Sequence, residues 1–322
     1  MNYLAVYLAL LLAVHAPVVC AQAYPVKPIR LIVPFAPGGT TEVLARIIGQ
    51  KMGESLGQQV VIDNRPGASG SLGAGLAAKA TPDGYTMLLT SLSPIVINVN
   101  MYAGKPPYDS EKDLAPVSLI TKVPSVITTH SATSTRTLKD IIAAAKASPK
   151  RITYGSSGAG GVNHLITELF SAAAGIELVH VPYKGAGPAM IALLSREVDL
   201  MVASPVAIMP QVRSGQVRAI AVSGALRSPA LPEVPTISES GLPGFDSTAW
   251  YCMMAPAGTP RAIIDKVRAA LVQALRTPAV TERLNGEGAA PEPSTPEELA
   301  KLIRDDIQRW ARAVRISGAK LD

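Results

Sequence analysis

Two glycine-rich segments stand where a predicted strand passes into a predicted helix, and the first precedes the helix predicted over Thr40–Leu56. Glycine lets the backbone approach a ligand closely, and the start of a helix presents unpaired N–H groups at the positive end of its dipole. This segment therefore favours an anion, although an ordinary turn with Thr40 or Thr41 as N-cap would look the same. Its residues are Ala36, Pro37, Gly38, Gly39, Thr40, Thr41 and Glu42.

The second segment runs from Tyr154 to His164, again at a strand-to-helix junction. Its small residues and hydroxyls could present a row of donors to a carboxylate. It satisfies neither of two catalytic motifs. A nucleophile elbow requires glycine two places after the serine, where Ser157 has Ala159, and a dinucleotide fingerprint requires glycine where Asn163 stands. The candidate ligand-binding residues are Ser156, Ser157, Gly160, Gly161, Asn163 and His164.

The remaining titratable residues indicate neither a metal site nor an acid–base pair. His164, near a helix start, is either a structural hydrogen-bonding residue or a ligand contact, and His180 stands in a strand predicted to be buried. Two cysteines and four histidines are too few or wrongly spaced for the common zinc sites, and the aspartates are scattered at turns. We expect no cofactor, no metal and no catalytic residue.

The elements that must position these segments alternate between short β-branched runs and amphipathic helices, which is typical of an α/β sheet with parallel strands. The pattern restarts after a long extended stretch, Leu114–Thr129, and Ser247–Met254 is predicted to return the chain to the first unit. Two similar α/β units joined by two crossings imply a cleft between them. The predicted domains are residues 24–125 with 248–322, and 126–247. Further predicted elements are the strands Ile29–Phe35, Val60–Asp63, Thr86–Thr90 and Leu200–Ala203, and the helices Ser71–Lys79, Leu138–Ala147, His164–Ala174, Arg261–Leu275 and Pro296–Val314.

The composition excludes several classes of protein. Hydrophobic residues make up 48% of the 322 residues and charged residues 17%, so the chain is not disordered. Aromatic residues are only 4% and the net charge is only +6, which argues against a nucleic-acid-binding design.

Residues 1–23 contain no charged side chain, and the apolar run Leu4–Ala16 is too short to span a bilayer. The triplet Ala21-Gln22-Ala23 after this run predicts a secretory signal peptide cut after Ala23, and no stable membrane insertion of the mature chain. A misassigned start or an uncleaved anchor is the alternative. A lipoprotein through Cys20 is disfavoured because Val19 stands where a small residue is required.

With these segments placed, the chain resembles the extracytoplasmic solute-binding proteins of tripartite tricarboxylate transporters, often called Bug receptors. The resemblance runs in family order over essentially the whole chain after Ala23. The matching strings are YPVKPIRLIVPFAPGG from Tyr24, VVIDNRPGASG from Val60, TPDGYTML from Thr81, YGSSGAGGVNHL from Tyr154, HVPYKGAGPA from His180, ALPEVPTISESGLPGF from Ala230 and APAGTP from Ala255.

The resemblance implies a periplasmic-binding-protein (Venus flytrap) fold that closes on a small organic carboxylate, a periplasmic location, a monomeric state and delivery to the membrane subunits of a transporter. It places the ligand between the two glycine-rich segments, with Ser91 and Ser204 facing the same cleft. Two residues depart from the family pattern. Glu42 stands where aspartate is common, and Gly161 stands where serine is common, which removes one hydroxyl donor.

Two other functions remain open at this point. The closed form could be read by a signalling receptor, with or without transport. An enzyme in the same cleft would have only Ser157 and His164 as local candidates, and no third partner can be assigned to them.

Overall fold

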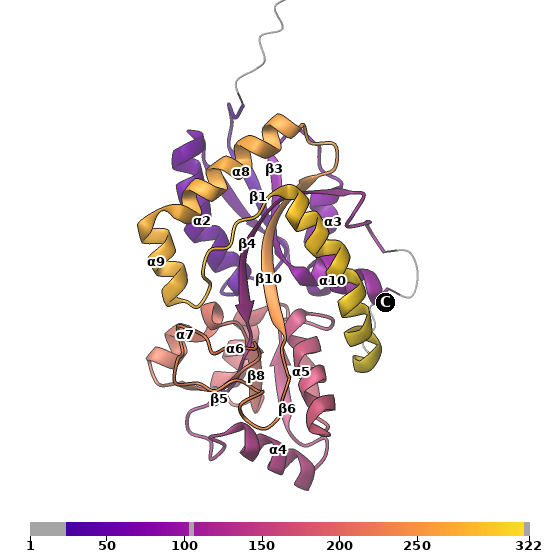
Figure 1. The fold of residues 1–322 in the computed structure, drawn as a ribbon, viewed down its shortest axis with the longest axis vertical. Helices are drawn as coiled ribbons and strands as arrows, with labels where there is room; N and C mark the ends of the chain where they lie inside the picture. The colour runs from indigo at the N-terminus through magenta and orange to yellow at the C-terminus, as the bar shows by residue number, and fades with distance from the viewer. Residues whose placement is uncertain (1–23, 103–105, 319–322) are drawn as a thin grey trace, which may run out of the picture.

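The computed structural model describes residues 24–102 and 106–318, so the predicted signal peptide lies outside the described residues. The chain forms two mixed α/β sheets, one above the other in Figure 1. The first sheet, with its flanking helices, is called the first lobe. Its strand order is β2 (Val60–Asn64), β1 (Ile29–Val33), β3 (Thr86–Ser91), β10 (Thr248–Pro256) and β4 (Leu114–Pro124).

The second sheet, with its helices, is called the second lobe. Its strand order is β7 (Val179–Pro182), β6 (Thr153–Ser156), β8 (Leu200–Ala203), β5 (Val126–His130) and β9 (Val217–Val222). Within each sheet three strands are parallel, as the sequence predicts: β1 with β2 and β3, and β6 with β7 and β8. The remaining pairings, made by β10 and β5, are antiparallel.

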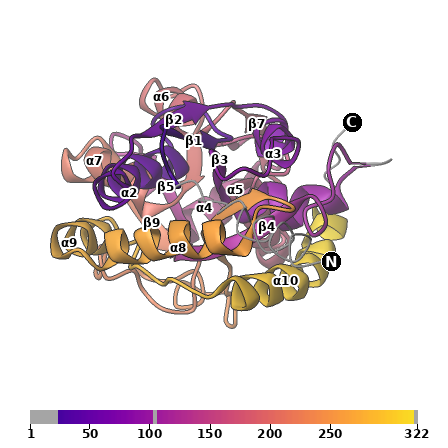
Figure 2. The ribbon, with the colours of Figure 1, turned by 90° about the horizontal axis from the view of Figure 1, so that it is seen from above.

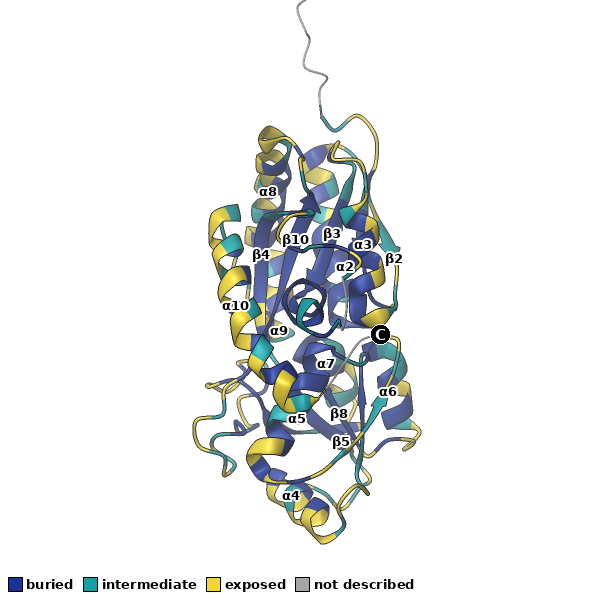
Figure 3. Ribbon diagram, turned by 90° about the vertical axis from the view of Figure 1, so that its right-hand side faces the viewer, coloured by how far each residue is buried: buried dark blue, intermediate teal, exposed yellow. Residues whose placement is uncertain are grey.

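Helices cover both sheets and carry apolar stripes toward them. Figure 2 shows α8 lying beside α2, and Figure 3 shows strands buried beneath helices whose outer sides are exposed. The α-helices are α2 (Thr40–Leu56), α3 (Ser71–Ala78), α4 (Leu138–Ala147), α5 (Val162–Ala174), α6 (Ala186–Leu194), α7 (Pro205–Arg213), α8 (Arg261–Arg276), α9 (Pro278–Gly286) and α10 (Pro296–Ser317). Short helical turns are η1 (Ala68–Gly70), η2 (Ser93–Ile97) and η3 (Asn98–Asn100).

The last helix, α10, reaches from one lobe to the other (Figure 1). It packs against β4 and η2 of the first lobe and against α5 of the second. Trp250 in β10 donates from Nε1 to Asp306 Oδ2 at 2.6 Å, and both residues are buried. Among residues 24–102 and 106–318, no helix combines the length and the apolar character that crossing a membrane requires.

The chain passes between the lobes twice, and three buried serines join the two passages. Ser125 separates β4 from β5, while Ser223 and Ser247 flank the segment between β9 and β10. The Ser125 N–H donates to Ser223 Oγ at 2.9 Å, and the Ser223 N–H donates to the Ser125 carbonyl at 2.8 Å. Ser223 Oγ also donates to the Ser247 carbonyl at 2.5 Å. The two crossings are therefore held together at one point.

The sequence-based prediction about the burial of the strand containing His180 is wrong. His180 lies in β7, a strand that its apolar sequence predicts to be buried. The structure places β7 at the edge of the second sheet, and none of its four residues is fully buried. The edge position follows from the parallel pairing of β7 with β6 alone.

Candidate functional site

A small cavity of about 30 Å³ lies between the two lobes. It has room for about two water molecules. Residues from both sheets contribute, and many follow the carboxyl ends of β1, β3 and β6, where ligands of open α/β sheets usually bind. Its lining is Phe35, Gly39, Thr40, Thr41, Ser91, Ser93, Ser157, Val162, Asn163, Ala186 and Tyr251. No side chain in this lining carries a formal charge.

Three helices begin in the lining of this cavity, and a fourth begins beside it. Thr40 of α2, Val162 of α5 and Ala186 of α6 line it, and Ser204, the N-cap of α7, hydrogen-bonds through its hydroxyl to that of Thr40. In none of these four helices does the N-cap residue's own side chain accept a hydrogen bond from the first turn, although the first N–H of α5 donates to Ser93 of the first lobe. In α4 and α10, which begin elsewhere, a threonine and an acidic residue form a capping box. The other four helix starts leave backbone N–H groups and positive dipole ends near the cavity.

The first glycine-rich segment meets the second lobe directly. Gly39 packs on Ala186, and Gly185 packs closely on Ala36. Tyr251, from β10, is buried behind Thr40 and Ser204. Burial raises the pKa of its phenol, and hydrogen bonds with those two side chains act in the opposite direction. Tyr251 is therefore a neutral hydroxyl group at physiological pH.

Glu42 does not line the cavity. Although the residue is only 5% exposed, its carboxylate pairs with Arg46, one turn further along α2, whose side chain is mostly exposed. The Gly38 N–H approaches Glu42 Oε2 at 3.5 Å. The Glu42 side chain therefore stabilises the segment 36–42, of which it is the last residue.

The second glycine-rich segment is held by contacts on both sides. Ser93 Oγ, from the first lobe, accepts from the Val162 N–H at 2.8 Å. Ser125 Oγ, at the crossing, donates to Asn163 Oδ1 at 2.8 Å. Within the segment, the Gly161 N–H donates to the Gly158 carbonyl at 3.1 Å. These bonds orient the first turn of α5 toward the cavity.

Three stacked aromatic rings, those of Tyr154, His180 and His164, contact the same segment. The rings of His164 and His180 are parallel, with centroids 3.9 Å apart, and Tyr154 stacks against His180 at 4.9 Å. The Gly160 N–H donates to His164 Nδ1 at 3.0 Å, and Ser156 Oγ bonds to His180 Nε2 at 2.6 Å. Each ring thus fixes one residue of the ligand-facing turn.

Both histidines are neutral at physiological pH. Burial, together with the charge that His180 would carry, lowers the pKa of His164 to about 3, and burial lowers the pKa of His180 to about 4. Because His164 Nδ1 is an acceptor, the ring proton is on Nε2. His164 Nε2 lies 3.9 Å from Glu168 Oε1, and the Tyr154 hydroxyl donates to the same oxygen at 2.5 Å. Burial raises the pKa of Glu168.

Fifteen residues are candidates from the sequence, and the structure divides them by position. Six line the cavity: Gly39, Thr40, Thr41, Ser91, Ser157 and Asn163. The others lie outside the lining, on the same two segments or beside Thr40: Ala36, Pro37, Gly38, Glu42, Ser156, Gly160, Gly161, His164 and Ser204. Five lining residues are not among these candidates: Phe35, Ser93, Val162, Ala186 and Tyr251. Four of these adjoin the predicted segments or another helix start, whereas Tyr251 sits within an apolar strand that gives no signal.

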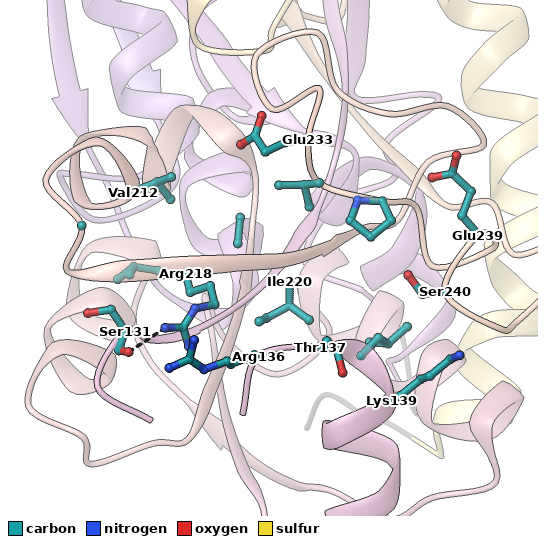
Figure 4. Close-up of a pocket in the computed structure, with 16 residues that line it drawn as sticks. Ser131, Arg136, Thr137, Lys139, Val212, Arg218, Ile220, Glu233, Glu239 and Ser240 are labelled. Atoms are coloured by element: carbon teal, nitrogen blue, oxygen red, sulfur yellow. Dashed lines mark hydrogen bonds between the residues drawn. The ribbon is translucent and has the colours of Figure 1, made fainter. Parts of the chain in front are cut away.

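A larger cavity of about 770 Å³ lies on the second lobe, away from the cleft (Figure 4). Its lining carries charges of both signs, including Arg136, Arg218, Glu233 and Glu239. The Arg218 guanidinium already donates to backbone carbonyls, among them that of Ser131 at 2.9 Å. Volume alone therefore does not identify the site. The smaller cavity is the better candidate because three helices begin in its lining and a fourth begins beside it.

Within the described part of the chain, no group of three or more His, Cys, Asp or Glu side chains is placed to hold a metal ion. Cys252 is a free, buried thiol whose pKa is raised by burial. The site therefore offers neutral hydrogen-bond donors: backbone N–H groups, hydroxyls and one amide.

Comparison with known proteins gives a consistent result. Residues 44–318 match the family model described as the tripartite tricarboxylate transporter family receptor. The chain is 40% identical over 309 residues to the protein BugT of Bordetella pertussis, covering 96% of this chain and 94% of that one. Among solved structures, Rpa4515 of R. palustris with adipate is 34% identical with a TM-score of 0.88, over 92% of this chain and 99% of that one. MatC of Rhodopseudomonas palustris with bound malate is 35% identical with a TM-score of 0.85, over 90% and 100% of the two chains.

Proposed function

Because the chain belongs to the receptor family of tripartite tricarboxylate transporters, we propose that it captures a small organic carboxylate between its two lobes and delivers it to the membrane subunits of such a transporter. The observation that carries this proposal is the meeting of four helix N-termini at or beside a cavity whose lining is uncharged and contains several hydroxyl groups. Two solved relatives hold adipate and malate, which are dicarboxylates. A dicarboxylate is therefore the ligand we propose here.

The proposed binding set consists of the segments 36–42 and 156–164 with Ser91 and Ser204, to which the structure adds Ser93 and Tyr251. Backbone N–H groups at the starts of α2 and α5 would hold one carboxylate, and hydroxyls would orient the ligand. Each charge-assisted hydrogen bond contributes about 1.5–3 kcal/mol net. Micromolar affinity corresponds to about 8 kcal/mol, so a few such bonds at each end of a dicarboxylate account for it without a buried arginine.

Closure is proposed to occur about the joined crossings at Ser125 and Ser223, between domains formed by residues 24–125 with 248–322 and by residues 126–247. Contacts made only in the closed state must drive it, because a ligand with equal affinity for both states shifts nothing. We further propose that the mature chain begins at Tyr24, is periplasmic and acts as a monomer. These points extend the N-terminal sequence pattern and the family resemblance.

We propose a receptor and not an enzyme, because His164 is committed elsewhere. Its Nδ1 accepts from Gly160 and its Nε2 faces Glu168. A neutral ring fixed in this way is not arranged to take a proton from Ser157. The low pKa of His164 also makes it a poor base at neutral pH.

The test is titration calorimetry of the purified chain, without residues 1–23, against malate, succinate, adipate, acetate and an uncharged amide analogue of malate. We expect micromolar binding of at least one dicarboxylate and none of the amide. Thr41→Val keeps the shape of a lining residue, removes its hydroxyl and should weaken binding about tenfold. Ser195→Ala is the matched control, because Ser195 Oγ donates to the Ala192 carbonyl within the second lobe, away from the cavity. If no carboxylate binds, the proposed function is wrong.

A further inference from the structure

A short loop of the first lobe, Gly67–Gly70, has a left-handed backbone at four consecutive residues. The φ values are +140° for Gly67, +45° for Ala68, +49° for Ser69 and +93° for Gly70. Glycine adopts such angles freely, but Ala68 and Ser69 do so only at an energetic cost. A strained loop of this kind persists when its surroundings determine it, and such strain often accompanies function.

The side chain of Asn98, in η3, holds this loop in its conformation. It is 1% exposed, and its Nδ2 donates to the Ala68 carbonyl at 3.3 Å, the Ser69 carbonyl at 3.2 Å and Ser71 Oγ at 2.7 Å. One amide group thus fixes the carbonyls of both strained residues. The direction of the Ser69 side chain follows from this arrangement.

Ser69 crosses to the second lobe. Its hydroxyl donates to the carbonyl of Ala159, in the second glycine-rich segment. The residues on either side of Ala159 also lie close to the first lobe. If Gly158 carried a Cβ atom, that atom would lie 2.9 Å from Ser69 Oγ, and a Cβ atom on Gly160 would lie 2.4 Å from Met101 Sδ. The two glycines therefore allow the segment to seat on the first lobe.

This contact is separate from the ligand cavity. Ser69, Asn98, Met101 and Ala159 are all absent from the cavity lining. The bond joins the two lobes, so it exists only when they are closed. A contact that forms only in the closed state raises ligand affinity by shifting the population toward that state, without touching the ligand.

We propose that Ser69, positioned by Asn98, is a latch between the lobes that determines how long the receptor stays closed. This inference rests on the proposed function, since it assigns the latch to the closure that traps a carboxylate. The latch stabilises the closed lobes whether or not a ligand lies between them. Its loss should therefore act on the rate of ligand release and shift the ligand-free chain toward open forms.

The experiment measures binding of malate and adipate to Ser69→Ala by calorimetry and stopped-flow fluorescence. Loss of one hydrogen bond should raise the Kd about three- to tenfold through faster release, with the association rate unchanged. Ser110→Ala is the matched control, because Ser110 is also buried and its hydroxyl also donates to a backbone carbonyl, that of Ile95 at 2.7 Å, but entirely within the first lobe. It should leave both rates unchanged.

Asn98→Asp is a second variant, since it replaces the Nδ2 donor by an oxygen facing two carbonyls. It should raise the Kd at least as much as Ser69→Ala, provided that circular dichroism shows native folding. The latch is overturned if Ser69→Ala leaves Kd and release within twofold of the parent, or if Ser110→Ala has the same effect.

A ligand-free measurement separates this proposal from the proposed function. If the parent chain binds no carboxylate, the proposed receptor function is wrong. Small-angle scattering of the ligand-free chain still tests whether Ser69 holds the lobes together. A radius of gyration larger in Ser69→Ala than in the parent and Ser110→Ala supports the latch. Equal radii in all three overturn it.

Discussion

Mild acidification should destabilise this protein, because the stacked pair His164 and His180 is neutral and buried. In the unfolded chain a histidine has a pKa near 6.5, whereas burial lowers the folded value to about 3 for His164 and about 4 for His180. As the pH falls below about 6.5, the unfolded chain therefore takes up protons that the folded chain does not. The stability that the pair contributes is fully present above pH 6.5 and is lost as the pH approaches the folded values.

The size of the effect follows from the two pKa differences. One pH unit corresponds to about 1.4 kcal/mol per proton, so each histidine loses about 2 kcal/mol between pH 7.5 and pH 5. Solvent screening reduces the loss of unfolding free energy that His180 contributes, because His180 lies on an edge strand. Glu168 opposes the trend, because its raised pKa means that its own burial penalty is relieved as the pH falls. We expect a net loss of about 2–4 kcal/mol.

The assay is urea unfolding followed by tryptophan fluorescence at pH 7.5, 6.5, 6, 5.5 and 5. His164→Gln should remove about half of the slope of unfolding free energy against pH. His130→Gln is the control, because His130 lies at the end of β5 outside the stacked cluster, and it should leave the slope unchanged. Ligand affinity should hold over the same range, because folded His164 stays neutral and continues to accept the Gly160 N–H.

The reasoning is refuted if the parent chain loses less than about 0.5 kcal/mol per pH unit between pH 6 and pH 5. An undiminished slope in His164→Gln would also refute it, because the protons would then be taken up elsewhere.

Two further predictions concern the crossings and the second segment. Ser223→Ala removes the acceptor of the buried Ser125 N–H and should cost about 1–3 kcal/mol of unfolding free energy in urea titrations; a cost below about 0.5 kcal/mol would contradict this role. Gly160→Ala forces a side chain into a backbone with φ of +72° and against Met101, so calorimetry should show malate binding weakened at least about fivefold. Gly175→Ala, with φ of +62° and open space around it, should affect stability alone; equal losses of affinity in both would contradict the packing argument.

Elements with strong local signals were predictable from the sequence. The helices over Thr40–Leu56 and Leu138–Ala147 and the strand Leu200–Ala203 have the predicted bounds. The helices α7 and α9 were missed because each begins with proline, at Pro205 and Pro278. Proline is favourable in the first turn of a helix, but without a clear apolar period it resembles a turn signal.

The site was predictable only where its residues are close together in the sequence. The glycine-rich segments could be found because glycine, hydroxyls and a following helix are adjacent in sequence. Tyr251 could not, because it reaches the cavity through the placement of β10 in the sheet, a long-range pairing. The stacking of His164 on His180 was likewise invisible, since it depends on β6 pairing with β7.

The position of β10 in the first sheet has a consequence for the order in which the protein can form. β10 pairs with β3 on one side and β4 on the other, and residues 125–247 separate β4 from it along the chain. Until β10 has been synthesised, both β3 and β4 present an unpaired edge, which is a template for aggregation. The second sheet has all its strands within residues 126–222 and can form earlier. A chain that ends before Thr248 should therefore leave a folded second lobe attached to an unfinished, association-prone first lobe.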